Sequence, residues 1–90
     1  MPSKLYESVQ RGAALLDKEN PGWERKINLR KLDMADPELC IIGLLYGNYL
    51  VGLRSLKLYL GMSANLHGFG AAGNRLWRKV ILERLGKGAK

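Results

Sequence analysis

DPELCIIGLLYGNYLVGLRSLKLYL, residues 36–60, is the stretch that decides the fold of this 90-residue chain. Residues 39–53 within it carry no charged side chain, and no other part of the chain is apolar for so long. Asp36 is a good N-cap residue, Pro37 suits the first helical position, and Glu38 favours the positive end of a helix dipole. These start signals and the length of the run predict one buried helix over residues 37–57, rather than a strand.

A first helix is predicted over residues 3–18, with Ser3 as a candidate cap. Its apolar side chains recur with helical spacing and would share one face: Leu5, Val9, Ala13 and Leu16. Gly12 would weaken this helix by about 1 kcal/mol relative to alanine unless something packs there. Asn20, Pro21 and Gly22 form a turn that ends the helix. We expect Trp23, which follows directly, to cover one end of the core.

A last helix is predicted over residues 74–85, ending at Gly86 and followed by a disordered tail, residues 86–90. One face of this helix is apolar: Leu76, Trp77, Val80, Ile81 and Leu85. We expect the connector 24–35 to lie extended across the core without pairing as a strand. A glycine-rich loop follows over 61–73, with Leu66 and Phe69 as its core anchors. The chain is therefore predicted to be a single all-α domain, a small bundle of three main helices with a long ordered connector.

The formal net charge of +7 is unevenly distributed. Residues 1–45 hold seven basic and seven acidic side chains, whereas residues 46–90 hold eight basic side chains and one acid, Glu83. Such an asymmetry indicates an anionic partner: a nucleic acid, an acidic protein or a lipid surface. The alternative is a solvated surface that maintains solubility. The residues predicted to bind a partner or a phosphate lie on and after the polar face of the last helix: Arg75, Arg78, Lys79, Arg84 and Lys87.

Gly43 and Gly47 have the GxxxG spacing that brings helices into close contact. Two interpretations follow for a helix over 37–57. The pair could form a tight crossing with the first helix near Gly12, or it could form the seam of a homodimer.

Catalytic and cofactor motifs are weak. Residues 68–73 form a literal G-x-G-x-x-G, but a dinucleotide fingerprint also requires a preceding strand and an acid about 20 residues later. A weaker hypothesis is a phosphate bound at that helix start beside Arg75. Cys40 and His67 are the only cysteine and histidine, so we expect structural roles for both, no metal site and no cofactor. The sequence predicts no enzyme activity.

The uncharged run is too short to span a membrane. Its 15 residues from Leu39 to Leu53 would span roughly 23 Å as a helix, compared with a hydrocarbon core of about 30 Å. We therefore expect a cytoplasmic protein without a membrane partner.

Several short motifs occur in an order that covers most of the chain. They are RGAALLDKENPGW (11–23), INL and LDM (27–34), CIIGLLYGNY (40–49), GL (52–53), HGF (67–69) and the tryptophan-containing last helix. In this pattern the chain resembles a family of small uncharacterised proteins of high-GC Gram-positive bacteria and their bacteriophages. The family's second cysteine position holds Pro37 here and its usual glutamine position holds Leu44, so cysteine-pair chemistry is not expected. The resemblance implies a phage-type gene product and brings no established activity.

Three functional hypotheses follow. The first is a non-enzymatic accessory protein of phage type that binds a macromolecule of the host cytoplasm, a protein in preference to a nucleic acid, and modulates it. The second is a nucleic-acid-binding protein that uses the basic last helix. The third is a structural homodimer joined along Gly43 and Gly47.

Overall fold

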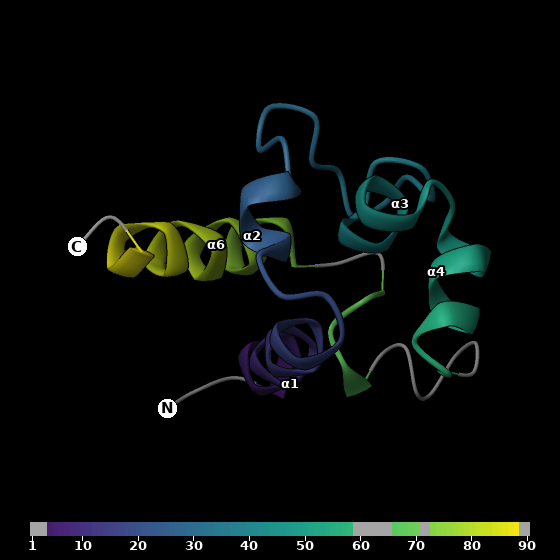
Figure 1. The fold of residues 1–90 in the computed structure, drawn as a ribbon, viewed down its shortest axis with the longest axis horizontal. Coiled ribbons are helices and arrows are strands. Elements are labelled where there is room, and N and C mark those ends of the chain that lie inside the picture. Colours follow the sequence, from purple (N-terminus) through teal and green to yellow (C-terminus); the bar gives the residue numbers. More distant parts are fainter. Residues whose placement is uncertain (1–3, 59–65, 71–72, 89–90) are drawn as a thin grey trace.

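The structure is a computed structural model that describes residues 4–58, 66–70 and 73–88 (Figure 1). For residues 87 and 88 it describes the backbone only. Over these residues the fold is all-α, as predicted, and contains no strand. The helices are α1 (Lys4–Glu19), α2 (Trp23–Lys26), α3 (Ile41–Tyr46), α4 (Tyr49–Ser55) and α6 (Asn74–Gly88). Figure 1 shows α1, α2 and α6 grouped on one side of the molecule and α3 with α4 on the other, with residues 66–70 passing between them.

The core is centred on the indole ring of Trp77 in α6, which is fully buried. Its Nε1 donates a 2.7 Å hydrogen bond to the carbonyl oxygen of Gly68. The Phe69 ring stacks on it at a centroid distance of 5.5 Å, and the Trp23 ring meets it edge-on at 5.9 Å. Trp23 is itself fully buried, which confirms its predicted place in the core. One side chain therefore joins α2, α6 and the segment 66–70.

The apolar face predicted for α1 is confirmed for Val9, Ala13 and Leu16, which are all fully buried. Leu5 lies at the edge of this face and is 37% exposed. Gly12 is buried on the same face, and a Cβ atom there would collide with the carbonyl oxygen of His67 and lie 3.1 Å from the Trp77 ring. The close neighbour of Gly12 is thus the segment that carries Gly68, rather than Gly43.

The connector predicted over 24–35 is ordered and contributes to the core, but the expected extended conformation is wrong: it begins in α2 and continues in turns, such as the one closed by the Lys31 N–H to the Asn28 carbonyl oxygen at 3.0 Å. Ile27, Leu32 and Met34 are buried. The Met34 backbone N–H donates a 2.7 Å hydrogen bond to the Asn74 side-chain oxygen at the start of α6. The connector therefore fixes the position at which α6 begins.

The prediction of one helix over residues 37–57 is wrong. Asp36 does act as a cap, since its Oδ1 accepts hydrogen bonds from the backbone N–H groups of Glu38 (2.8 Å) and Leu39 (3.3 Å), but it caps a turn. The helix α3 begins five residues after Asp36, and its N-cap is Cys40, whose Sγ accepts from the Gly43 N–H at 3.3 Å. A local capping signal thus started a turn instead of a long helix.

The same stretch is broken again after Tyr46. Gly47 ends α3 in the left-handed region, at φ 89°, where its N–H donates to the Gly43 carbonyl oxygen at 2.7 Å. Asn48 then caps α4, because its side-chain oxygen accepts from the Leu50 N–H at 2.8 Å. A glycine C-cap followed by an asparagine N-cap is a strong combination of stop and start signals. These two residues divide the apolar run into two short helices.

The division also removes the predicted helix-packing seam through Gly43 and Gly47. A Cβ atom on Gly43 would collide with the Pro37 carbonyl oxygen and lie 2.6 Å from the Glu38 carbonyl carbon, so Gly43 packs against its own preceding turn. Gly47 is exposed and has open space around it. The two glycines do not share a helix face, so the predicted crossing with α1 through this pair is wrong, whereas the homodimer stays a prediction.

The C-terminal half follows the prediction with two corrections. Trp77, Val80 and Ile81 are buried in α6 as expected, but α6 runs to Gly88, three residues beyond the predicted end at Leu85. Of the two expected loop anchors, Phe69 is buried whereas Leu66 is 50% exposed. The cap expected at Ser3, most of the glycine-rich loop and the end of the predicted tail lie outside the described residues. In the described part of the chain, none of the helices has the length and apolar character that crossing a bilayer requires.

We predict that Gly12→Ala and Gly86→Ala have opposite effects on stability. Gly86 lies inside α6, and a Cβ atom there would have no neighbour within 4 Å. Because alanine is the better helix former, Gly86→Ala should raise the free energy of unfolding by about 0.5–1 kcal/mol. Gly12→Ala should lower it by about 1–3 kcal/mol, because the His67 backbone cannot move aside as a flexible side chain could. Urea denaturation followed by far-UV circular dichroism measures both values. An increase in stability for Gly12→Ala would contradict the packing of α1 described above.

Candidate functional site

The outer face of α6 carries a shallow groove of about 710 Å³ that is open to solvent. Since Trp77, Val80 and Ile81 occupy the buried face, the residues between them point away from the core. The described residues that line the groove come from three successive turns of α6: Asn74, Arg75, Arg78, Lys79, Leu82 and Glu83. The structure thus brings together three of the predicted site residues, Arg75, Arg78 and Lys79.

The three cations of the groove are held in different ways. Arg78 is half-buried, and its Nη2 donates a 3.2 Å hydrogen bond to the Leu32 carbonyl oxygen of the connector. Lys79 is exposed, with its Nζ 5.8 Å from the centroid of the Tyr6 ring on α1. Arg75 is exposed in the first turn of α6. Arg78 therefore forms a fixed wall of the groove, while Arg75 and Lys79 extend into solvent.

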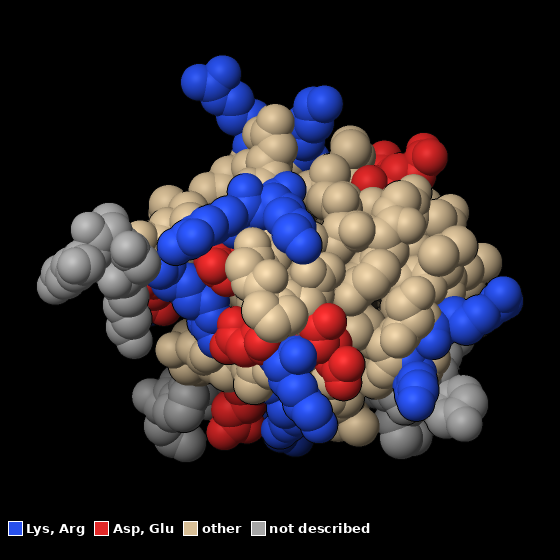
Figure 2. Space-filling view, viewed as in Figure 1, with Lys and Arg blue, Asp and Glu red and all other residues tan. Residues whose placement is uncertain are grey.

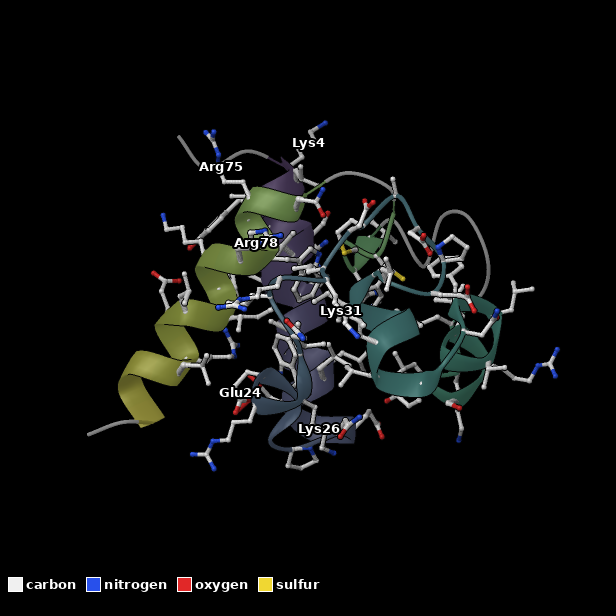
Figure 3. The ribbon with its side chains drawn as sticks, turned by 90° about the horizontal axis from the view of Figure 1, so that it is seen from above. Lys4, Glu24, Lys26, Lys31, Arg75 and Arg78 are labelled. Atoms are coloured by element: carbon white, nitrogen blue, oxygen red, sulfur yellow. The ribbon has the colours of Figure 1, made fainter. Side chains whose placement is uncertain are left out.

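The first turns of α1 and α6 lie at the same end of the molecule. A Cβ atom on Gly73 would lie 3.8 Å from the Leu5 side chain, and Figure 3 shows Lys4 near Arg75 at the starts of the two helices. Because the positive ends of both helix dipoles are found here, they add to the charge of these side chains. At this end the two helix dipoles therefore add to the positive charge of Lys4 and Arg75, and Glu7 is the acid in the first turn of α1.

Lys31 extends this basic region on the connector side. It precedes Leu32, whose carbonyl oxygen accepts from Arg78, and it is labelled below Arg78 in Figure 3. We use the term cationic face for the five residues Lys4, Lys31, Arg75, Arg78 and Lys79. Lys4 and Lys31 were not predicted, because both lie in the half of the sequence with no net charge. Only the packing of α1 and the connector against α6 brings them to this face.

The charge is arranged differently on the side of the molecule that carries α2. Figure 2 shows basic and acidic side chains alternating there, and a largely uncharged surface over α3. Glu24 on α2 lies at the far end from Lys4 and Arg75 in Figure 3. Basic side chains therefore occur on several sides of the molecule, but on the α2 side acids lie between them, whereas the first turn of α6 holds no acid.

Arg84, predicted as part of the same basic face, is engaged within the fold. Its Nη2 and Nε donate to the two carboxylate oxygens of Asp17 on α1, at 2.8 and 3.2 Å, and its guanidinium lies 5.8 Å from the Trp23 ring centroid. Asp17 also accepts a 2.8 Å hydrogen bond from the Trp23 indole. The carboxylate thus joins α1, α2 and α6, and Arg84 is a structural residue. The Lys87 side chain lies outside the described residues.

Cys40 and His67 both make structural contacts, since Cys40 caps α3 and His67 stacks on a core ring. Cys40 is 1% exposed, and burial raises the pKa of its thiol, which disfavours the nucleophilic thiolate. A smaller pocket of about 220 Å³ lies beside it, and the Tyr49 hydroxyl, whose pKa burial also raises, is on the pocket wall. The His67 ring stacks on Phe69 at a centroid distance of 6.3 Å. Among the described residues, no group of three or more His, Cys, Asp or Glu side chains could hold a metal ion.

No family model, curated protein or solved structure matches this chain. The resemblance to phage-type proteins therefore stays a prediction from the motifs. A functional hypothesis has to be based on the residues of the protein surface.

We predict that Asp17→Asn lowers the free energy of unfolding at pH 7 by about 1 kcal/mol. The value is modest because the Asp17 side chain is 46% exposed and solvent screens the ion pair. The hydrogen bond from Arg84 and that from Trp23 hold the pKa of Asp17 below its ordinary value of 3.8, against the opposing effect of desolvation. A lowered folded-state pKa means that the stabilisation is complete above about pH 4 and is lost as the pH falls through the folded-state pKa.

The difference between the native protein and Asp17→Asn should accordingly shrink as the pH falls from 4 to 2, as measured by urea denaturation at each pH. Glu19→Gln is the control, because Glu19 is an exposed carboxylate at the end of the same helix. It should change the unfolding free energy by less than about 0.5 kcal/mol. A difference for Asp17→Asn that stays constant down to pH 2 would show that the carboxylate charge is not involved.

Proposed function

We propose that the protein is a non-enzymatic binding protein whose cationic face docks on an acidic surface of a partner protein and modulates that partner. The observation that carries the proposal is the position of Leu82, which is 56% exposed in the groove beside the basic side chains. With the resemblance to phage-type proteins, the partner we propose is a protein of the host cell.

The composition of the groove favours a protein over a nucleic acid. Interfaces with nucleic acids rely on rows of cations that neutralise successive phosphates. Here the basic residues Arg75 and Lys79 are followed by an apolar side chain, Leu82, and an acid, Glu83. Arg84, which would continue a row of cations, is paired with Asp17. An apolar centre with a charged rim is typical of protein interfaces.

A nucleic acid remains the second candidate, because the cationic face carries five basic side chains, two of which, Lys4 and Arg75, lie at helix starts. The two candidates differ in their response to salt. Duplex DNA should be released steeply as salt rises, whereas a partner held partly by Leu82 should retain much of its affinity.

The matched variants that test the proposal each change the net charge by four. Arg75→Glu/Lys79→Glu reverses the cationic face, and Arg25→Glu/Arg54→Glu reverses exposed residues of α2 and α4. We expect a partner captured from host lysate by the native protein to be recovered at least tenfold less by the first variant, because like charges would then face each other. The control variant should recover it as the native protein does.

Quantitative mass spectrometry of the captured proteins gives the result. Equal recovery by both double variants would contradict the proposal, as would capture of no protein above background. A gel shift with duplex DNA at low salt, abolished by the first variant alone, would replace the protein partner with a nucleic acid.

A further inference from the structure

We infer that the partner contributes an amphipathic helix, acidic at one end and basic at the other, that lies along α6 over Asn74–Glu83. Its carboxylates meet Arg75 and Lys79, an apolar side chain covers Leu82, and a basic side chain meets Glu83. This inference rests on the proposed function and specifies the chemistry of the partner.

The periodicity of the groove favours a helical ligand. Arg75, Lys79 and Leu82 follow one another at intervals of four and three residues, so they form a ridge along one side of α6. From Asn74 to Glu83 this ridge is about 14 Å long at 1.5 Å per residue. A second helix packed at an interaxial distance of about 8–10 Å can match a ridge of this kind with its own side chains three and four residues apart.

An extended ligand lacks a backbone partner at this surface. A bound strand gains its affinity from the unpaired edge of a sheet, and the described part of the chain contains no strand. The groove is lined by side chains of a helix whose backbone is already hydrogen-bonded internally. A helix satisfies its own backbone groups and needs only side-chain contacts, which this groove offers.

The order of charges along the groove sets the orientation of the ligand. Both exposed cations, Arg75 and Lys79, lie towards the start of α6, and the single acid, Glu83, lies at the other end beyond Leu82. A ligand that is acidic along its whole length would place a carboxylate against Glu83. The complementary ligand therefore carries acids at one end and a base at the other, on either side of an apolar residue.

The affinity expected is in the micromolar range or weaker. One face of a single short helix buries less than the roughly 1,600 Å² of a standard stable interface, and the cations are exposed to solvent. Leu82 adds an apolar contact that salt does not screen. The contact is suited to a transient association.

The test uses a dye-labelled 18-residue helical peptide with leucines on one face, glutamates flanking them in one half and lysines flanking them in the other. A scrambled peptide of the same composition distributes the leucines around the helix. Fluorescence anisotropy at two salt concentrations gives the affinities. We expect the amphipathic peptide to bind at least tenfold more tightly than the scrambled one, and this preference to be lost in Arg75→Glu/Lys79→Glu and in Leu82→Ser.

A charge exchange tests the orientation. Glu83→Lys should weaken binding of the peptide severalfold, and replacing the peptide lysines with glutamate should restore it. Glu24→Lys, a charge change of equal size on α2, should leave binding unchanged. Circular dichroism of each variant confirms that α6 is folded, so that loss of binding is not a loss of structure.

Equal affinity for both peptides, or binding that survives Arg75→Glu/Lys79→Glu, would overturn the inference. If Glu83→Lys strengthens binding of the lysine-containing peptide, the inferred orientation of the ligand helix is wrong. A third outcome is that neither peptide binds, while the native protein still captures a lysate partner that Arg75→Glu/Lys79→Glu does not capture. The helical ligand is then wrong and the proposed function stands. If neither the peptide nor a lysate partner binds, both are wrong.

Discussion

The burial of the Trp77 indole is the constraint on which the rest of this structure depends. An indole N–H taken out of water needs a hydrogen-bond acceptor, because leaving such a donor unsatisfied costs about 1–3 kcal/mol. The acceptor is the carbonyl oxygen of Gly68, and the flat faces and edges of the ring are covered by Phe69 and Trp23. Gly12 allows α1 to approach closely enough to complete the enclosure. Segments far apart in the sequence thus converge on one side chain.

This constraint determines which face of α6 is left for function. With Trp77, Val80 and Ile81 buried, the residues on the other side must face solvent. Arg75 sits in the first turn of α6, where no acid balances it and where a cation is unfavourable by about 0.3–1 kcal/mol against the helix dipole. Stability alone would favour an acid at that position. The basic start of α6 is therefore not explained by the stability of the helix.

Helical periodicity was enough to predict the outer elements of the fold. The apolar faces of α1 and α6 and the burial of Trp23 follow from side-chain spacing and size, which are local properties. The prediction of one long helix over 37–57 was wrong. The composition of this apolar run suggests a continuous helix, but the caps at Cys40 and Asn48 and the left-handed Gly47 divide it. A cysteine is a weak sequence signal for the start of a helix. Asn48 is a stronger one, but it lies in a mostly apolar run that was interpreted as the interior of a single helix.

The candidate site was predicted in part, for a similar reason. Arg75, Arg78 and Lys79 share a helix face and could be grouped from the sequence. Arg84 lies on the same helix, but its engagement depends on Asp17, a contact across 67 residues of sequence. Lys4 and Lys31 join the cationic face only because α1 and the connector pack against α6. Charge counted along the chain cannot distinguish a cation that is paired within the fold from one that is presented to a partner.

The most direct measurement of the central claim is the hydrogen exchange of the Trp77 indole N–H, followed by NMR in D₂O. If this group is buried and bonded to Gly68, it should exchange only when the whole domain unfolds, about 10³-fold or more slowly than a free indole. Asp17→Asn identifies the other indole signal, since it perturbs the bond that Asp17 accepts from Trp23. Exchange of the Trp77 signal at the rate of a free indole would contradict the account, because neither the core nor the orientation of α6 would then be fixed as described.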